Sequence, residues 1–194
     1  MAFLPLPDER TADARARATL QAAKERWGYL PNIVRALALR PELLVAEDAW
    51  SRALMYSGLL PRALKEAVAT TVSVVNQCDY CATSHAYAAA RAGAPEAARA
   101  CARLDFRSLP ERDRAALDFT RKAASDMRSI RQPDVDALRA HFSPEEIAEL
   151  AAVIGSFMMY NTFVTVLGLE LEAPHEGRHL LTPPGSPSPS GRPR

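Results

Sequence analysis

Three residues near the middle of the chain have types and spacing that suit thiol chemistry. Cys78, Cys81 and His85 follow one another at steps of three and four residues, so on a helix they lie on one face. This spacing brings two thiols within reach of each other and places an imidazole one turn after the second thiol. If a helix begins near Cys78, its dipole and free amide groups favour the thiolate form of both cysteines at neutral pH.

A carboxylate upstream of the cysteines is a candidate partner for the imidazole. Eleven residues separate Glu66 from Cys78, and in one continuous helix the two would lie about 18 Å apart, too far to act together. Asn76 and Gln77 lie between two apolar helical segments, and we predict that the helix is broken there. A hairpin there places Glu66, ten residues before Asn76, roughly level with His85, nine residues after it. The hypothesis is that Glu66 fixes the tautomer of the imidazole and stabilises its cation.

The segments that must position these residues are all predicted to be helices. Alanine is the commonest residue, with 36 of 194, and no segment alternates polar and apolar residues with a period of two. Ser143, Pro144 and Glu146 form a helix start with a capping box, and Asn32 is expected to cap a short helix. We predict a single all-α domain of about eight helices over residues 1–181, with the cysteine pair at a helix N-terminus. The expected helices cover residues 11–27, 33–39, 41–53, 61–75, 78–92, 95–104, 110–127 and 144–168.

Composition excludes several classes of protein. The 24 Lys and Arg balance 23 Asp and Glu, so the chain lacks the basic excess of a nucleic-acid-binding protein. Residues 1–10 lack the pattern of a signal peptide, and the apolar stretch 153–169 is interrupted by Gly155 and Asn161, which favours a buried helix over a membrane span. Three cysteines do not make a disulfide scaffold. We therefore expect a cytoplasmic protein that binds neither nucleic acid nor membrane.

The end of the chain differs in composition from the rest. Residues 182–194 contain five of the 15 prolines and four serines or threonines, with no apolar side chain larger than proline. Such a segment cannot bury enough surface to offset the entropy of ordering it. We predict that these residues form a disordered tail.

The spacing Glu-x11-Cys-x2-Cys-x3-His, on an alanine-rich helical chain, resembles that of a known family. It is similar to the AhpD-like alkylhydroperoxidases of the carboxymuconolactone decarboxylase superfamily, and more narrowly to their peroxidase-related branch. The segments 27–32, 39–44 and 160–168 fit the same branch, so the resemblance covers roughly residues 25–170.

The resemblance implies a dithiol peroxidase of hydrogen peroxide or organic hydroperoxides that needs no haem, flavin or metal. It implies that Cys81 attacks the peroxide, that Cys78 resolves the sulfenic acid as a disulfide, and that His85 and Glu66 relay protons. It also implies an external dithiol reductant and a homo-oligomer, a trimer or hexamer. The sequence differs from the best-studied members at Tyr80, where they carry an additional histidine, and it leaves open what that does to the relay.

Other interpretations of the same residues remain at this point. Cys78 and Cys81 could be buried packing residues, as Cys101 is expected to be, or could bind zinc with His85 and Glu66 in a non-enzymatic helical module. The thiol pair could also serve a general thiol–disulfide oxidoreductase or redox sensor. A decarboxylase or lactone-processing activity gives the paired thiols no obvious role.

Overall fold

The computed structural model describes residues 2–172. The tail predicted to be disordered, residues 182–194, lies outside the described residues, as does the end of the domain predicted at residue 181. Over the described range the chain is all-α, which confirms the predicted fold class, and it forms nine α-helices with no strand.

The helices follow one another with short connections. Two short irregular helical turns, the π-helical η1 (Arg52–Tyr56) and the 3-10 helix η2 (Met127–Ser129), accompany the α-helices. The nine α-helices are α1 (Ala14–Trp27), α2 (Asn32–Leu37), α3 (Pro41–Ser51), α4 (Arg62–Val75), α5 (Asp79–Arg91), α6 (Pro95–Arg103), α7 (Glu111–Ser125), α8 (Gln132–Arg139) and α9 (Pro144–Leu167).

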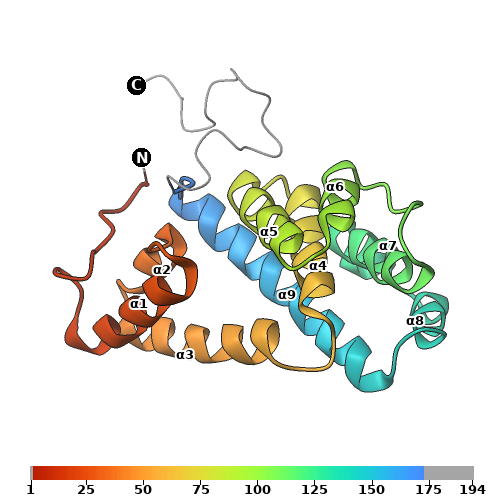
Figure 1. The fold of residues 1–194 in the computed structure, drawn as a ribbon, viewed down its shortest axis with the longest axis horizontal. Coiled ribbons are helices and arrows are strands. Elements are labelled where there is room, and N and C mark those ends of the chain that lie inside the picture. Colours follow the sequence, from red (N-terminus) through yellow and green to blue (C-terminus); the bar gives the residue numbers. More distant parts are fainter. Residues whose placement is uncertain (1, 173–194) are drawn as a thin grey trace, which may run out of the picture.

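The longest helix, α9, runs through the middle of the molecule, with α1 to α3 on one side and α4 to α8 on the other (Figure 1). Its 18-residue apolar window has a mean hydropathy of 1.7, and its length would also suit a membrane span. In this fold 44% of that window is buried, and α9 packs against α4, α5, α7 and α8. The helix start predicted here is confirmed: the backbone of Ser143 donates to Glu146, and the Ser143 hydroxyl accepts from the Glu146 amide.

The predicted hairpin between α4 and α5 is present, and it is the most extensively packed helix pair of the fold. Helix α4 buries Leu64, Val68 and Val72 at steps of four along one face. The helix ends at Asn76, and Gln77 adopts a left-handed conformation with φ of 56°. The Cys78 amide then donates to the Ser73 carbonyl at 2.9 Å, which reverses the chain.

Two sequence-based expectations are corrected. The ninth helix, α8, was not among the eight expected, because it is short and buries only Leu138, so it lacks an apolar repeat. Asn32 was expected to cap α2, but Pro31 occupies the cap position. The Asn32 side-chain amide instead donates to the Glu170 carbonyl at 2.9 Å, because the chain after α9 folds back against α2.

A buried lysine holds the connection between α3 and α4. The side chain of Lys65 is 1% exposed, and its Nζ donates to the Leu54 carbonyl at 2.7 Å, to the Ser57 carbonyl and to Glu149 Oε1 at 2.7 Å. The other oxygen of Glu149 accepts from the Leu59 amide at 2.6 Å. The ion pair therefore fixes the π-helical turn η1, of which the predicted helix 41–53 included only the first two residues.

Replacing Lys65 by methionine is expected to lower the free energy of unfolding by about 3 kcal/mol, because Glu149 then keeps a charge without its partner. Urea denaturation followed by circular dichroism measures this change. In the double variant Lys65→Met/Glu149→Leu the unpaired charge is gone, and more than half of the loss is expected to return. A single variant as stable as the wild type would show that the ion pair does not support η1.

Candidate active site

The α4–α5 hairpin places the two cysteines at the start of a helix. Cys78 is the N-cap residue of α5, and Cys81 lies in its first turn. Both are free thiols, and both are nearly inaccessible, with 3% and 2% of their surfaces exposed. Their surroundings differ, because Cys81 lines a large cavity and Cys78 does not, although both belong to one buried cluster with Val164 and Leu169. Of the two sulfur-bearing residues, Cys81 is the one that faces the cavity.

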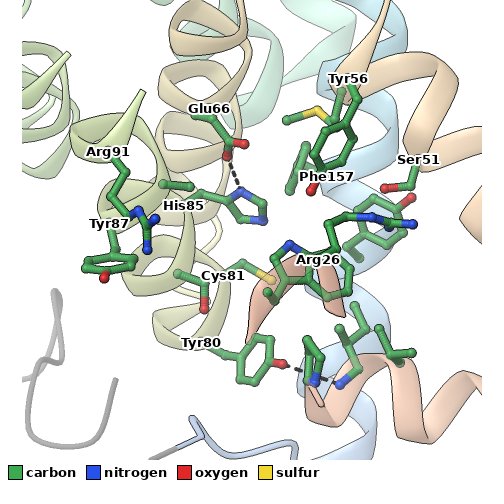
Figure 2. Close-up of a pocket in the computed structure, with 18 of the residues that line it drawn as sticks. Arg26, Ser51, Tyr56, Glu66, Tyr80, Cys81, His85, Tyr87, Arg91 and Phe157 are labelled. Atoms are coloured by element: carbon green, nitrogen blue, oxygen red, sulfur yellow. Dashed lines mark hydrogen bonds and ion pairs between the residues drawn. The ribbon is translucent and has the colours of Figure 1, made fainter. Parts of the chain in front are cut away.

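Glu66 and His85 meet across the hairpin, as the counting of residues predicted. His85 Nδ1 lies 2.6 Å from Glu66 Oε2 (Figure 2). The side chain of Glu66 is 1% exposed, and its second oxygen accepts from Arg62 Nε at 2.7 Å. Burial opposes a charge on Glu66, but His85 and Arg62 outweigh it, and the pKa of Glu66 is lowered below its usual value. Glu66 is therefore a carboxylate at neutral pH.

The imidazole of His85 is held in one orientation. Its ring packs edge-on against Phe157, with centroids 4.5 Å apart and planes at 81°. Because the Glu66 carboxylate can only accept a hydrogen bond, Nδ1 donates it, and Nε2 lies on the opposite side of the ring. In Figure 2 the side of the ring opposite Glu66 faces the cavity beside Cys81. The histidine can accept or return a proton there.

The two thiols share a hydrogen bond, and this bond shifts their pKa values in opposite directions. A hydrogen bond from Cys81 lowers the pKa of Cys78. The same bond and burial raise the pKa of Cys81 well above its usual value. The prediction that the helix start lowers the pKa of both cysteines is therefore wrong for Cys81, because two adjacent buried sulfurs cannot both carry a charge easily. The two thiols of the reduced pair therefore titrate together rather than as independent groups.

Tyr80, between the cysteines, belongs to a different cluster. Its phenol is buried and donates to Glu172 Oε1 at 2.5 Å, while the Ile33 amide donates to the phenol oxygen at 3.3 Å. Glu172 also accepts from the Asn32 amide, and burial raises its pKa. Figure 2 shows Tyr80 on the side of Cys81 away from the Glu66–His85 pair. The Tyr80 phenol thus ties α5 to α2 and to the chain after α9.

Replacing Tyr80 by phenylalanine is expected to cost about 1–3 kcal/mol of stability, because the buried Glu172 oxygen loses its hydroxyl donor. Urea unfolding of the reduced protein measures the loss. Tyr87→Phe is the matched control, since that ring is 39% exposed on the same helix, and it should change stability by less than about 0.5 kcal/mol. If Tyr80→Phe is as stable as the control, the phenol does not anchor Glu172.

The cavity beside Cys81 has a volume of about 680 Å³. Its wall comes from α1, the α1–α2 connection, α2, α3, η1, α4, α5 and α9. At the wall, Tyr160 donates to Glu47 Oε1 at 2.9 Å, and burial raises the pKa of Glu47. Cys81, His85 and Glu66 all line the same cavity. Thiol, imidazole and carboxylate are thereby presented together to whatever molecule enters.

Sequence reasoning missed three contributors to this site. Arg62 is four residues before Glu66, a helical ion-pair spacing that could have been read from the sequence. Phe157 and Glu172 lie far along the chain and carry no local signal. Within residues 2–172, no group of three or more His, Cys, Asp or Glu side chains is arranged to hold a metal ion. Glu66 and His85 bond to each other rather than converging with the thiols on one point.

Comparisons with known proteins agree with the fold. Residues 41–120, which include all four motif residues, match the carboxymuconolactone decarboxylase family. No curated protein matches the chain in sequence. A peroxidase-related protein from Ralstonia eutropha with an alkylhydroperoxidase AhpD core is 26% identical, with a TM-score of 0.83 over 94% of this chain and 97% of that chain.

Two further solved structures share the architecture. A peroxidase-related protein from a Silicibacter species is 28% identical, with a TM-score of 0.80 over 90% of this chain and 93% of that one. The debrominase Bmp8 is 23% identical, with a TM-score of 0.76 over 88% of this chain and 93% of that one, and shows likeness of fold. These likenesses support the assignment of the chain to the AhpD/carboxymuconolactone decarboxylase superfamily.

Proposed function

We propose that this protein is a thiol-dependent peroxidase that reduces hydrogen peroxide or organic hydroperoxides through a reversible Cys78–Cys81 disulfide. The observation that carries the proposal is the placement of Cys81 on the cavity, next to the His85–Glu66 pair and with a second thiol behind it. Family membership alone does not choose the reaction, because the family is named for a decarboxylase and one neighbour in structure is a debrominase.

The proposed reaction begins when the thiol pair loses a proton and becomes negatively charged. The pair loses one proton to His85 through the cavity, and the proton shared by the two sulfurs moves from Cys81 to Cys78, so that Cys81 becomes the thiolate. Cys81 then attacks the outer peroxide oxygen, the O–O bond breaks, and the leaving alkoxide or hydroxide takes the proton from His85. The products are an alcohol, or water, and a sulfenic acid at Cys81.

The second half of the reaction closes the disulfide. Cys78 attacks the sulfur of the sulfenic acid, the S–O bond breaks, and water leaves with the Cys78 proton. Two thiols are thus oxidised to one disulfide for each peroxide reduced. We propose that an external dithiol reopens the disulfide by thiol–disulfide exchange and completes the cycle. No resident cofactor is required by these steps.

We further propose that the protein acts as a homo-oligomer, a trimer or hexamer, in the reducing cytoplasm. A strip of apolar side chains on α9 supports self-association, since Met159 is 52% and Val166 65% exposed. A shallow apolar groove that also includes Met158, Phe163 and Leu167 continues this strip. Exposed apolar patches of this kind are typical of protein interfaces.

A stopped-flow experiment tests the proposed activity. The reduced protein is mixed with excess tert-butyl hydroperoxide, and its thiols are counted. We expect two thiols to disappear together with one alcohol formed, while Cys101 remains, because it is fully buried and burial raises its pKa to about 11. Fast exchange with small disulfides, together with peroxide rates no better than those of a free thiol, would instead identify a general thiol–disulfide oxidoreductase or redox sensor.

A further inference from the structure

The cavity beside Cys81 is much larger than hydrogen peroxide requires. It measures about 680 Å³. A water molecule in the liquid occupies about 30 Å³, and hydrogen peroxide has only one heavy atom more than water. Sites that bind organic molecules typically measure about 300–1,000 Å³. The space is therefore suited to a peroxide that carries an organic body.

The wall of the cavity is unusually aromatic for this chain. Only 7% of the residues are aromatic, yet all five tyrosines of the sequence line this cavity, together with Trp27 and Phe157. Aromatic walls bind flat, apolar bodies by stacking and edge-to-face contacts. Three of the rings, those of Tyr29, Tyr56 and Tyr160, come from parts of the chain other than α5. They would contact the body of a ligand whose reactive end lies at Cys81.

The charged groups of the cavity are largely satisfied within the protein. Arg62 is paired with Glu66, and its guanidinium lies over the ring of Tyr56 at 3.9 Å. Arg26 is paired with Asp48 at 2.9 Å. The remaining arginine of the wall, Arg91, is exposed and lies over the ring of Tyr87. With these charges paired or held at the edge, the inner surface favours an uncharged ligand.

We propose that the preferred substrate is an uncharged organic hydroperoxide with an aromatic body, an inference that rests on the proposed peroxidase function. The body lies among the aromatic rings, and the hydroperoxyl group lies at Cys81 and His85. The transfer of the outer oxygen to the Cys81 sulfur then releases the corresponding aromatic alcohol. Ser51 lines the wall of the cavity opposite Cys81 (Figure 2).

The test compares three peroxides on the reduced wild-type protein and on two variants. Second-order rates of thiol oxidation are measured with cumene hydroperoxide, tert-butyl hydroperoxide and hydrogen peroxide. We expect cumene hydroperoxide to react at least about tenfold faster than hydrogen peroxide, the size of discrimination that an apolar pocket provides. Ser51→Trp fills the cavity and should remove most of this preference, whereas Ser51→Ala leaves the cavity open and should retain it.

A binding measurement separates this inference from the proposed function. The product 2-phenylpropan-2-ol cannot oxidise thiols, and calorimetry should detect its binding to the wild type but not to Ser51→Trp. Equal rates with the three peroxides, or no binding of the alcohol, would overturn the aromatic preference and leave the peroxidase intact. No fast oxidation by any peroxide would overturn the proposed function itself. The wild-type comparison does not depend on either variant folding.

Discussion

Replacing Cys81 by serine is expected to abolish the fast oxidation of the reduced protein, whereas replacing Cys78 by serine should leave a sulfenic acid trapped at Cys81. Cys81 lines the cavity and Cys78 does not, so only Cys81 meets the peroxide directly. A hydroxyl is a far weaker nucleophile than a thiolate, and the rate should fall by more than about 10³-fold in Cys81→Ser, as it does when other enzymes lose a nucleophile.

The measurement is stopped-flow oxidation with tert-butyl hydroperoxide, followed by trapping of sulfenic acid with dimedone and mass spectrometry. Cys101→Ser is the matched control, because that sulfur is fully buried elsewhere and should not change the rate. The reverse pattern, with sulfenic acid trapped at Cys78, would contradict the assignment. The hydrogen bond between the thiols lowers the pKa of Cys78 and raises that of Cys81, so the trapping experiment decides which sulfur attacks the peroxide.

Replacing His85 by alanine should slow oxidation by about 10²-fold, the lower end of the contribution of a positioned acid–base group. Glu66→Gln should slow it by a similar factor, because the amide no longer stabilises the imidazolium, although it retains the shape of the side chain. The two effects should not add, since the carboxylate acts through the imidazole it contacts at 2.6 Å. His141→Ala, outside the cavity, is the control for histidine loss and should keep the wild-type rate.

The Glu66 variant also has a defined pH signature in stability. The folded-state pKa of Glu66 lies below its ordinary value of 4.5. The carboxylate therefore contributes stability that is fully present above about pH 5.5, where the unfolded chain is also ionised, and that is lost as the pH falls through the folded pKa. Urea unfolding of wild type and Glu66→Gln should show a constant difference near neutral pH that shrinks below pH 4.5. A difference that grows in acid would contradict the ionised state assigned to Glu66.

The helical character of this chain and the core of its candidate site were accessible from sequence because both depend on local spacing. Local sequence determines where a helix begins or ends, as at the helix start from Ser143 to Glu146 and at the break at Asn76 and Gln77. Once the break is known, counting residues along two antiparallel helices is enough to bring Glu66 level with His85. Each residue adds a fixed rise along an α-helix, so a number of residues converts directly into a distance.

Other features have no local signature. Lys65 and Glu149 pair across 84 residues, and Tyr80 donates to Glu172 across 92 residues, so neither contact could be read from spacing. The π-helical turn η1 and the unexpected partner of Asn32 follow from contacts of this kind. Long-range packing decided these details over local propensity.

By itself, the sequence determined that the protein is helical and that a thiol pair, an imidazole and a carboxylate share one hairpin, because those relations depend only on residue types and helical periodicity. The tertiary structure alone decided which sulfur faces a cavity, in which direction the pKa of each thiol is shifted, and how large and aromatic that cavity is. These properties depend on residues from α1 to α9 that meet only when the chain is packed, so that burial and neighbouring charges act together on each group.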